Sequence, residues 1–268
     1  MMALCVSERA RVPEFSTVDI ADGIWLVTIS RPERMNALHP PANFELADIF
    51  AQFAADPDAR VAILTGAGER AFCAGNDLRY LAEGHPRRVP ELGFAGLTAN
   101  YQRSKPVIAA VNGLALGGGF EIALACDLII AAEHAYFGLP EVRVGLAATA
   151  GGLHRLPRQI GLKPALGMIL TGRRVQADEA LQLGIVNEVV PGPELLDCAR
   201  RWAQQIIECA PLSIRTSLDV VNRGLAEASL ELAASADYAS VKALYASADA
   251  HEGPRAFAEK RKPEWRGR

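Results

Sequence analysis

The sequence predicts an α/β protein with two regions: a layered core over residues 1–190 that carries the functional site, and a helical region over residues 191–268. Short, wholly apolar segments recur in the first region, and a wholly apolar strand needs cover on both faces, as in a parallel sheet between helices. The second region instead repeats apolar residues at helical spacing. With 268 residues, the chain is long enough to bury one sizeable core.

The first region alternates strand-like and helix-like segments. Gly23–Ser30 is short and β-branched, which predicts a strand, and the apolar face of Pro41–Ala55 predicts a helix with proline in its first turn. The uniformly apolar segments that predict buried strands are Val61–Thr65, Pro106–Val111 and Leu128–Ala132. Tyr80–Thr98 is irregular and holds glycine, proline and arginine, so we expect a mobile, functional surface loop there.

The second region predicts helices over Pro193–Cys209, Pro211–Leu225 and Ala226–Ser247. Helices that follow a finished core often pack on a neighbouring chain. We therefore expect an oligomer.

Composition excludes several classes of function. The net charge of −3 and the lack of a basic stripe argue against nucleic acid or an anionic membrane as partner. No apolar stretch reaches the ~18 uncharged residues of a membrane span, and Met1–Ala10 has no export signal, so we expect a cytoplasmic protein. Neither the histidines nor the cysteines show metal-ligand spacing, so no metal is expected and the thiols should be reduced. The cysteines are Cys5, Cys73, Cys126, Cys198 and Cys209.

Gly113–Asp127 is the first candidate for chemistry. Three glycines at 117–119 precede an apolar helix, whose first turn presents free N–H donors and the positive end of the helix dipole. Such a site suits a carbonyl oxygen that gains negative charge. Alternatively, the glycines let the helix pack tightly against a strand.

Glu121 is the only charged residue between Asn112 and Asp127, on a helix that is otherwise apolar. Burial of an unpaired carboxylate costs several kcal/mol, on the order of the whole stability of a domain. Helical side chains lean toward the N-terminus, so we expect this carboxylate to point back toward the glycine donors and to act as a general acid or base. A structural salt bridge is the alternative. Desolvation favours its neutral form and the helix dipole favours the anion.

Glu141 follows Pro140 between apolar segments and is a candidate second acid. By itself, an acid after a proline is most often a surface residue at a helix N-terminus. Two acids around one apolar cavity, however, suit the addition of water, because one can activate the water while the other handles a carbon-bound proton.

Gly66–Leu78 weakly matches a dinucleotide-binding loop, but no amphipathic helix follows its glycines, so we reject that interpretation. Phe72–Leu78 instead predicts a tight turn with exposed N–H groups from Asn76 onward. The sequence has no serine-hydrolase elbow and no phosphate-binding lysine loop, and Cys73 is interpreted as a small buried side chain.

Six segments taken together resemble the crotonase (enoyl-CoA hydratase/isomerase) superfamily, in order from about residue 20 to the C-terminus. They are Arg31–Leu38, Ala71–Leu78, Val111–Asp127, Phe137–Gly152, Leu170–Val190 and the ending E-G-P-R-A-F-A-E-K-R-K-P-E-W-R-G-R. Within the superfamily the chain is most similar to enoyl-CoA hydratases and carnitinyl-CoA dehydratases.

The resemblance implies a crotonase-type spiral of ββα units with an α-helical C-terminal trimerisation region, assembled as a homotrimer or as a hexamer of two trimers. It implies Glu121 and Glu141 as catalytic acids, the N–H groups of Asn76 and Gly118 as an oxyanion hole, and an acyl-CoA thioester as substrate. No separate cofactor is implied, since coenzyme A is part of the substrate. The residues implied to bind the substrate or its CoA portion are Met35, Ala37, Ala74, Asp77, Leu78, Gly117, Phe257 and Lys260.

The implied reaction is the reversible syn addition of water to the C2–C3 double bond of a trans-2-enoyl-CoA. The alternatives are a double-bond isomerase, a carnitinyl-CoA-type dehydratase, and a catalytically silent paralogue that binds a CoA ester or RNA. Gly145–Gly152 departs from many hydratases because it lacks their proline. Because that loop shapes the acyl end of the site, the sequence leaves the acyl group undetermined.

Overall fold

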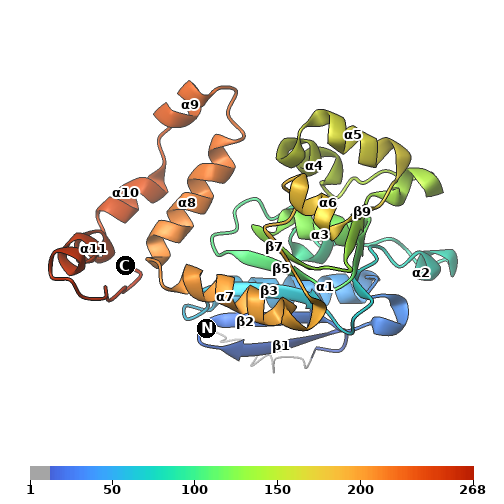
Figure 1. Ribbon diagram of the computed structural model, residues 1–268, viewed down its shortest axis with the longest axis horizontal. Coiled ribbons are helices and arrows are strands. Elements are labelled where there is room, and N and C mark those ends of the chain that lie inside the picture. The colour runs from blue at the N-terminus through green and yellow to red at the C-terminus, as the bar shows by residue number, and fades with distance from the viewer. Residues whose placement is uncertain (1–12) are drawn as a thin grey trace, which may run out of the picture.

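The computed structural model describes residues 13–268. Met1–Ala10, the segment on which the expectation of no export signal rests, lies outside the described residues, as does Cys5. Two sheets form the core (Figure 1). The six-stranded sheet has the order β1 (Ser16–Ala21), β2 (Ile24–Ile29), β3 (Val61–Gly66), β5 (Val107–Val111), β7 (Leu128–Ala132) and β10 (Glu188–Val190).

The strands predicted from apolar runs are confirmed. β3 and β5 are buried along their whole length, and both pair in parallel with their neighbours, as uniformly apolar strands require. β1 had no sequence signal because it is a largely exposed edge strand, antiparallel to β2, with only its first residue buried.

The second sheet is built from very short strands and places the functional loops. Its order is β4 (Ala71–Cys73), β6 (Leu114–Leu116), β8 (Tyr136–Gly138) and β9 (Val175–Gln176). Three successive turns of the chain each contribute one strand to the six-stranded sheet and the next strand to the four-stranded sheet. These pairs are β3 and β4, β5 and β6, and β7 and β8. This arrangement is the expected spiral. Since β4, β6 and β8 pair in parallel, the loops that follow them leave from the same edge.

The helices cover the sheets and form the second region. They are α1 (Pro40–Ala55), α2 (Leu78–Ala82), α3 (Gly118–Ala125), α4 (Gly152–Ile160), α5 (Leu162–Thr171), α6 (Ala177–Gln182), α7 (Leu195–Ile207), α8 (Pro211–Gly224), α9 (Leu230–Ser235), α10 (Ala239–Tyr245) and α11 (Ala248–Ala258). The predicted helices that correspond to α1 and α7 appear within two residues of their expected bounds. α7 packs on β3, β5 and β7, so this part of the second region belongs to the core layers.

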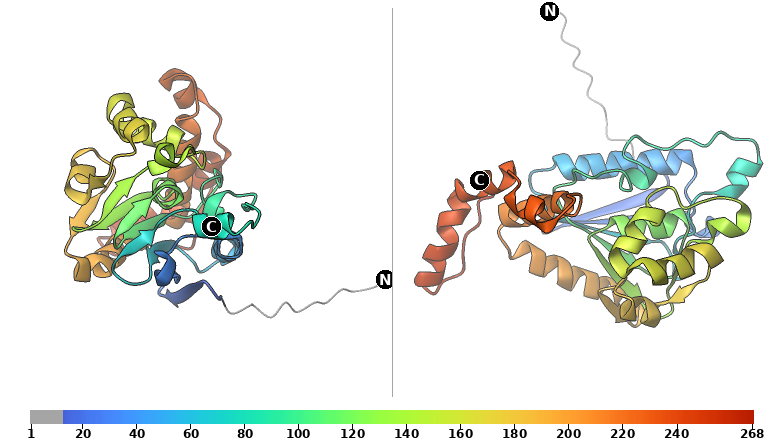
Figure 2. Two further views of the ribbon diagram at one scale, coloured as in Figure 1. Left: turned by 90° about the vertical axis from the view of Figure 1, so that its right-hand side faces the viewer. Right: turned by 90° about the horizontal axis from the view of Figure 1, so that it is seen from above.

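Beyond α7, the helices α8 to α11 form a C-terminal arm that projects away from the sheets (Figures 1 and 2). The expectation of a continuous helix over Ala226–Ser247 is wrong: α9 ends at Ser235, and Ala236 is extended with a ψ of 147°. Ser229 and Ser247 cap α9 and α11 by accepting a hydrogen bond from a backbone N–H, whereas α10 begins after Tyr238 without a side-chain cap. No helix within residues 13–268 is both long enough and apolar enough to cross a membrane.

Candidate active site

Glu121 lies in the first turn of α3, which begins after Gly117 in a left-handed conformation with a φ of 54°. The helix starts deep in the core because a Cβ at Gly119 would lie 1.9 Å from the carbonyl oxygen of Cys73, so only glycine permits this approach. Glu121 is therefore only 3% exposed. The tight-packing interpretation of the glycines thus holds for Gly119.

The hydrogen-bond donor to Glu121 is not the one expected. Its Oε1 accepts from the N–H of Gly152, at 2.9 Å, and not from the glycines of its own helix. Gly152 opens α4, and a Cβ there would lie 3.1 Å from both Oε1 and Cγ of Glu121. Among the ion pairs of the described residues none includes Glu121, so the salt-bridge alternative is wrong.

Glu141 reaches the same place from the next turn of the spiral. It lies in a short 3₁₀ helix, η3 (Pro140–Val144), directly after β8, whereas α3 follows β6, and these two strands pair in parallel. Its Oε1 lies 3.1 Å from the position that a Cβ of Gly117 would take. Its Oε2 is buried and accepts no hydrogen bond in the described part of the protein. Leaving a buried acceptor without a donor costs about 1–3 kcal/mol, a cost usually tolerated at functional sites.

Burial dominates the electrostatics of both acids. Desolvation raises the pKa of Glu121 to about 7, the hydrogen bond from Gly152 opposes this rise, and the negative charge of Glu141 adds to it. Desolvation likewise raises the pKa of Glu141. Glu121 therefore exchanges its proton much closer to neutral pH than an exposed glutamate does. Two neighbouring carboxyl groups of this kind can accept one proton and deliver another.

Main-chain donors stand beside the acids. Gly75, with a φ of 90°, approaches α3 so closely that a Cβ there would lie 2.8 Å from the nitrogen of Gly118. Asn76 follows directly and is held by a parallel bridge to Leu38. Within residues 13–268, the N–H groups of Asn76 and Gly118 donate to no protein acceptor. The pair is thus available to a ligand oxygen.

The stretch Tyr80–Thr98 contributes a wall to the site. Its last part, Phe94–Thr98, is buried and not the exposed loop expected for the whole stretch. A Cβ on Gly118 would lie 2.8 Å from Cε1 of Phe94, so the Phe94 ring packs directly on that glycine.

Several residues expected to bind CoA gather next to Asn76. The N–H of Ala74 donates to the carbonyl oxygen of Met35 at 3.0 Å, and Ala37 follows two residues later. The carboxylate of Asp77 is engaged within the protein, because it pairs with Arg31 at 3.1 Å and accepts from the N–H of Tyr80 as the cap of α2. Leu78 opens that helix and is half exposed.

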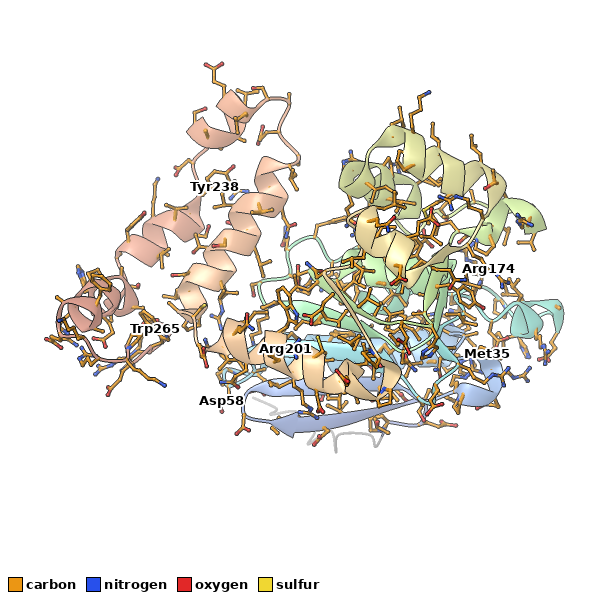
Figure 3. All side chains as sticks on the ribbon, viewed as in Figure 1. Met35, Asp58, Arg174, Arg201, Tyr238 and Trp265 are labelled. Atoms are coloured by element: carbon orange, nitrogen blue, oxygen red, sulfur yellow. The ribbon has the colours of Figure 1, made fainter. Side chains whose placement is uncertain are left out.

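Phe257 and Lys260 do not reach this place within one chain. Phe257 lies on α11 and is 87% exposed. Figure 3 shows Met35 and Trp265 at opposite ends of the molecule, and Trp265 packs on Gly253 of α11.

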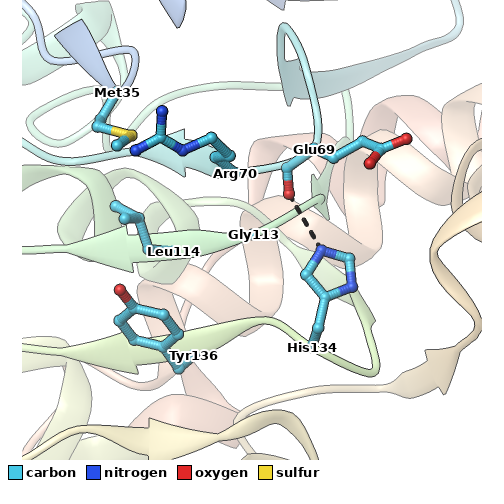
Figure 4. Close-up of a pocket in the computed structure, with 7 residues that line it drawn as sticks. All are labelled: Met35, Glu69, Arg70, Gly113, Leu114, His134 and Tyr136. Atoms are coloured by element: carbon cyan, nitrogen blue, oxygen red, sulfur yellow. Dashed lines mark hydrogen bonds between the residues drawn. The ribbon is translucent and has the colours of Figure 1, made fainter.

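A cavity of about 500 Å³ lies elsewhere. It opens on the outer, half-exposed side of the four-stranded sheet, where Leu114 pairs with Tyr136, and it contains neither acid (Figure 4). The Nε2 of His134 lies 3.1 Å from the carbonyl oxygen of Glu69 at its rim. The pair of acids, and not this cavity, therefore marks the candidate site. No group of three or more histidine, cysteine or acidic residues that could hold a metal occurs in the described part of the chain.

Sequence reasoning missed two residues of this site: Gly152 and Phe94. The glycine pair Gly151–Gly152 before a helix was the available signal, because it marks a second helix start with free N–H donors. From the sequence, we noted only that the loop Gly145–Gly152 lacks the proline found in many hydratases. Phe94 lay in a stretch without periodicity and had no signal of its own.

In this fold and site, the buried carboxyl group of Glu121 and the half-buried one of Glu141 stand beside two free main-chain N–H groups, an arrangement suited to acid–base chemistry. A family profile described as enoyl-CoA hydratase/isomerase matches residues 19–268. The carnitinyl-CoA dehydratase of Proteus mirabilis is 47% identical over 253 residues, which cover 90% of this chain and 94% of that protein.

Solved structures agree. An enoyl-CoA hydratase from Mycobacterium marinum shares 39% identity with a TM-score of 0.89, covering 95% of this chain and 99% of that one. A carnitinyl-CoA hydratase from Mycobacterium avium shares 41% identity with a TM-score of 0.76, covering 96% and 100%. The chain belongs to the enoyl-CoA hydratase/isomerase family, within the crotonase superfamily. It is a lyase-type hydratase or dehydratase, and enzymes of this family generally need no cofactor.

The raised pKa of Glu121 predicts a pH-dependent effect on stability. Between pH 4.5 and about 7 the folded protein holds a proton that the unfolded chain releases, so this residue costs stability as pH rises through that range. Glu121→Gln removes the cost. We expect it to stabilise the protein at pH 8 more than at pH 4.5, by on the order of 2 kcal/mol. Thermal unfolding at both pH values, with the exposed Glu133→Gln as control, measures this; an equal effect at both would contradict it.

Proposed function

We propose that the protein is an enoyl-CoA hydratase, which adds water reversibly and syn across the C2–C3 double bond of a trans-2-enoyl-CoA thioester. One observation carries the proposal: Glu121 and Glu141 both approach the start of α3, next to the free N–H groups of Asn76 and Gly118. An isomerase needs only one proton-shuttling acid, whereas addition of water uses two.

In the proposed mechanism, the thioester oxygen lies between the N–H groups of Asn76 and Gly118, and the water lies between the two acids. As the water oxygen bonds to C3, the electrons of the double bond move onto the thioester oxygen. One glutamate takes a proton from the water and the other gives a proton to C2, so the pair keeps the same number of protons. Each preorganised donor to such an oxygen is worth about 2.7–4 kcal/mol.

The same proposal assigns the CoA portion to Met35, Ala37, Ala74 and the backbone at Asp77–Leu78, beside Gly117. Because the arm keeps Phe257 and Lys260 at the far end of the chain, these residues would serve the site of a neighbouring subunit in a homotrimer or a hexamer.

Dehydration of a carnitinyl-CoA-type ester is the second candidate. It is supported by the 47% identity to carnitinyl-CoA dehydratases over 94% of their length. The pair of acids can catalyse both hydration and dehydration. The choice between the two candidate substrates therefore depends on the pocket that binds the acyl group. By the resemblance, the loop between Glu141 and Gly152 would border that pocket; its Leu146 is 48% exposed.

A panel of CoA esters tests both candidates. We expect the protein to remove the conjugated-thioester absorbance of short trans-2-enoyl-CoA esters, with a 3-hydroxyacyl-CoA product identified by mass. An ester whose acyl chain ends in a quaternary ammonium measures the second candidate in the same assay. Turnover of 3-enoyl esters to 2-enoyl esters without water addition, or no turnover of any ester, would refute hydration.

A further inference from the structure

We propose that Arg155 is a positioning residue for the acid–base pair: its guanidinium ties the start of α4, which holds Glu121, to the turn that backs Gly118. This inference rests on the proposed hydratase function. It adds a residue that contacts neither acid through a hydrogen bond in the described structure, yet joins the two halves of the site.

On the α4 side, Arg155 folds back over the helix start. Its Nη1 lies 2.1 Å from the position that a Cβ of Gly151 would take, so the guanidinium occupies the space of a missing side chain. Gly151 has a φ of 112°, which also favours glycine. The next residue, Gly152, donates to Glu121. The guanidinium therefore packs against the peptide that fixes this donor.

On the other side, the Nη2 of Arg155 donates to the carbonyl oxygen of Thr98 at 2.9 Å. The Oγ1 of Thr98 in turn accepts from the N–H of Phe94 at 2.8 Å. Because the Phe94 ring packs on Gly118, this chain of contacts runs from the acid's donor to the oxyanion donor.

The charge of Arg155 is not used in an ion pair. Within residues 13–268 it pairs with no carboxylate, whereas the nearby Arg103 is paired with Asp127 at 2.5 Å. Its guanidinium carbon lies 5.6 Å from the centre of the Tyr101 ring, a weak stabilisation. Burial lowers the pKa of Arg155, so keeping this cation here costs free energy. A stability role alone does not account for it.

The charge of Arg155 also acts on Glu121. Two charged groups act on that carboxyl group: Glu141 from η3 raises its pKa and Arg155 from α4 lowers it. Loss of the positive charge should raise the pKa of Glu121. In a plot of kcat against pH, the limb that reports the ionisation of Glu121 should then move to higher pH, whether Glu121 acts as acid or as base.

Arg155→Gln and Arg155→Lys test the proposal in the full-length protein, with crotonyl-CoA as substrate. For Arg155→Gln we expect kcat to fall at least about tenfold, KM to change less than about threefold, and the Glu121 limb to move to higher pH. Arg155→Lys keeps the charge and loses the planar fork, so kcat should fall while the limb stays in place. The control is Arg158→Gln, one turn further on the same helix, where the exposed side chain only bonds the His154 carbonyl oxygen.

The proposal is overturned if Arg155→Gln keeps wild-type kcat, or if its loss of activity follows its loss of folded protein with an unchanged pH profile. Should that variant fail to fold, Arg155→Lys decides: wild-type kcat overturns the proposal and a reduced kcat at unchanged KM supports it. A wild-type enzyme that hydrates no ester would instead refute the proposed function, so the two failures are distinguishable.

Discussion

Glu121→Gln is expected to lower kcat for hydration by about 10²–10⁴-fold, the usual contribution of a positioned acid or base. Glutamine is nearly isosteric and can still accept the hydrogen bond from Gly152, so the site should keep its shape. It cannot exchange a proton. The KM for the ester should stay within a few-fold, since CoA contacts lie elsewhere.

Glu141→Gln should have a comparable effect, and the double variant should lose little more than either single one, because the two acids act as a unit. Stopped assays with crotonyl-CoA give the rates, and Glu133→Gln serves as the exposed control. Hydration at the wild-type rate by Glu121→Gln would remove this residue from the mechanism.

Gly75→Ala should lower kcat by about 10²–10³-fold, the cost of losing one oxyanion donor. Its methyl group would lie 2.8 Å from the nitrogen of Gly118 and would cover the N–H on which the thioester oxygen depends. The backbone also matters, because alanine is strained at a φ of 90°.

Gly161→Ala separates the two effects. Gly161 has a φ of 83°, and a Cβ there meets no atom within 4 Å, so this variant carries similar strain without blocking a donor. Gly161→Ala should lose about 1–3 kcal/mol of stability from backbone strain, and Gly75→Ala should lose more because its Cβ also meets backbone atoms at 2.8 Å. Thermal unfolding measures both losses, and only Gly75→Ala should lose activity per folded molecule. Equal kcat values for the two would refute the placement of the oxyanion hole.

The core strands could be predicted because a strand that is buried on both faces consists of a continuous run of apolar residues. β3, β5 and β7 lie within a residue of the apolar runs that predicted them. The three-residue strands β4, β6 and β8 could not be found this way, since they are shorter than any periodic pattern. The break between α9 and α10 was missed because residues 226–247 keep helix-forming composition throughout, and no side-chain cap marks the start of α10.

The sequence by itself determined the class of chemistry. A single acid in an apolar helix that follows three glycines is expected to be buried. Burial of such a carboxylate lowers the stability of the protein, which favours a role in function. The resemblance of six ordered segments then supported Glu141 as the second acid and implied the oxyanion donors and the kind of substrate.

Only the tertiary structure decided how the site is held. Glu121 accepts a hydrogen bond from Gly152, and the charge of Arg155 lowers its pKa. Both residues lie on α4, about thirty residues away along the chain. Glu141 meets it because β6 and β8 run in parallel and end at one edge. Such contacts depend on how helices pack across the spiral. A pattern along the chain records which residues are buried, and it does not record which of them meet.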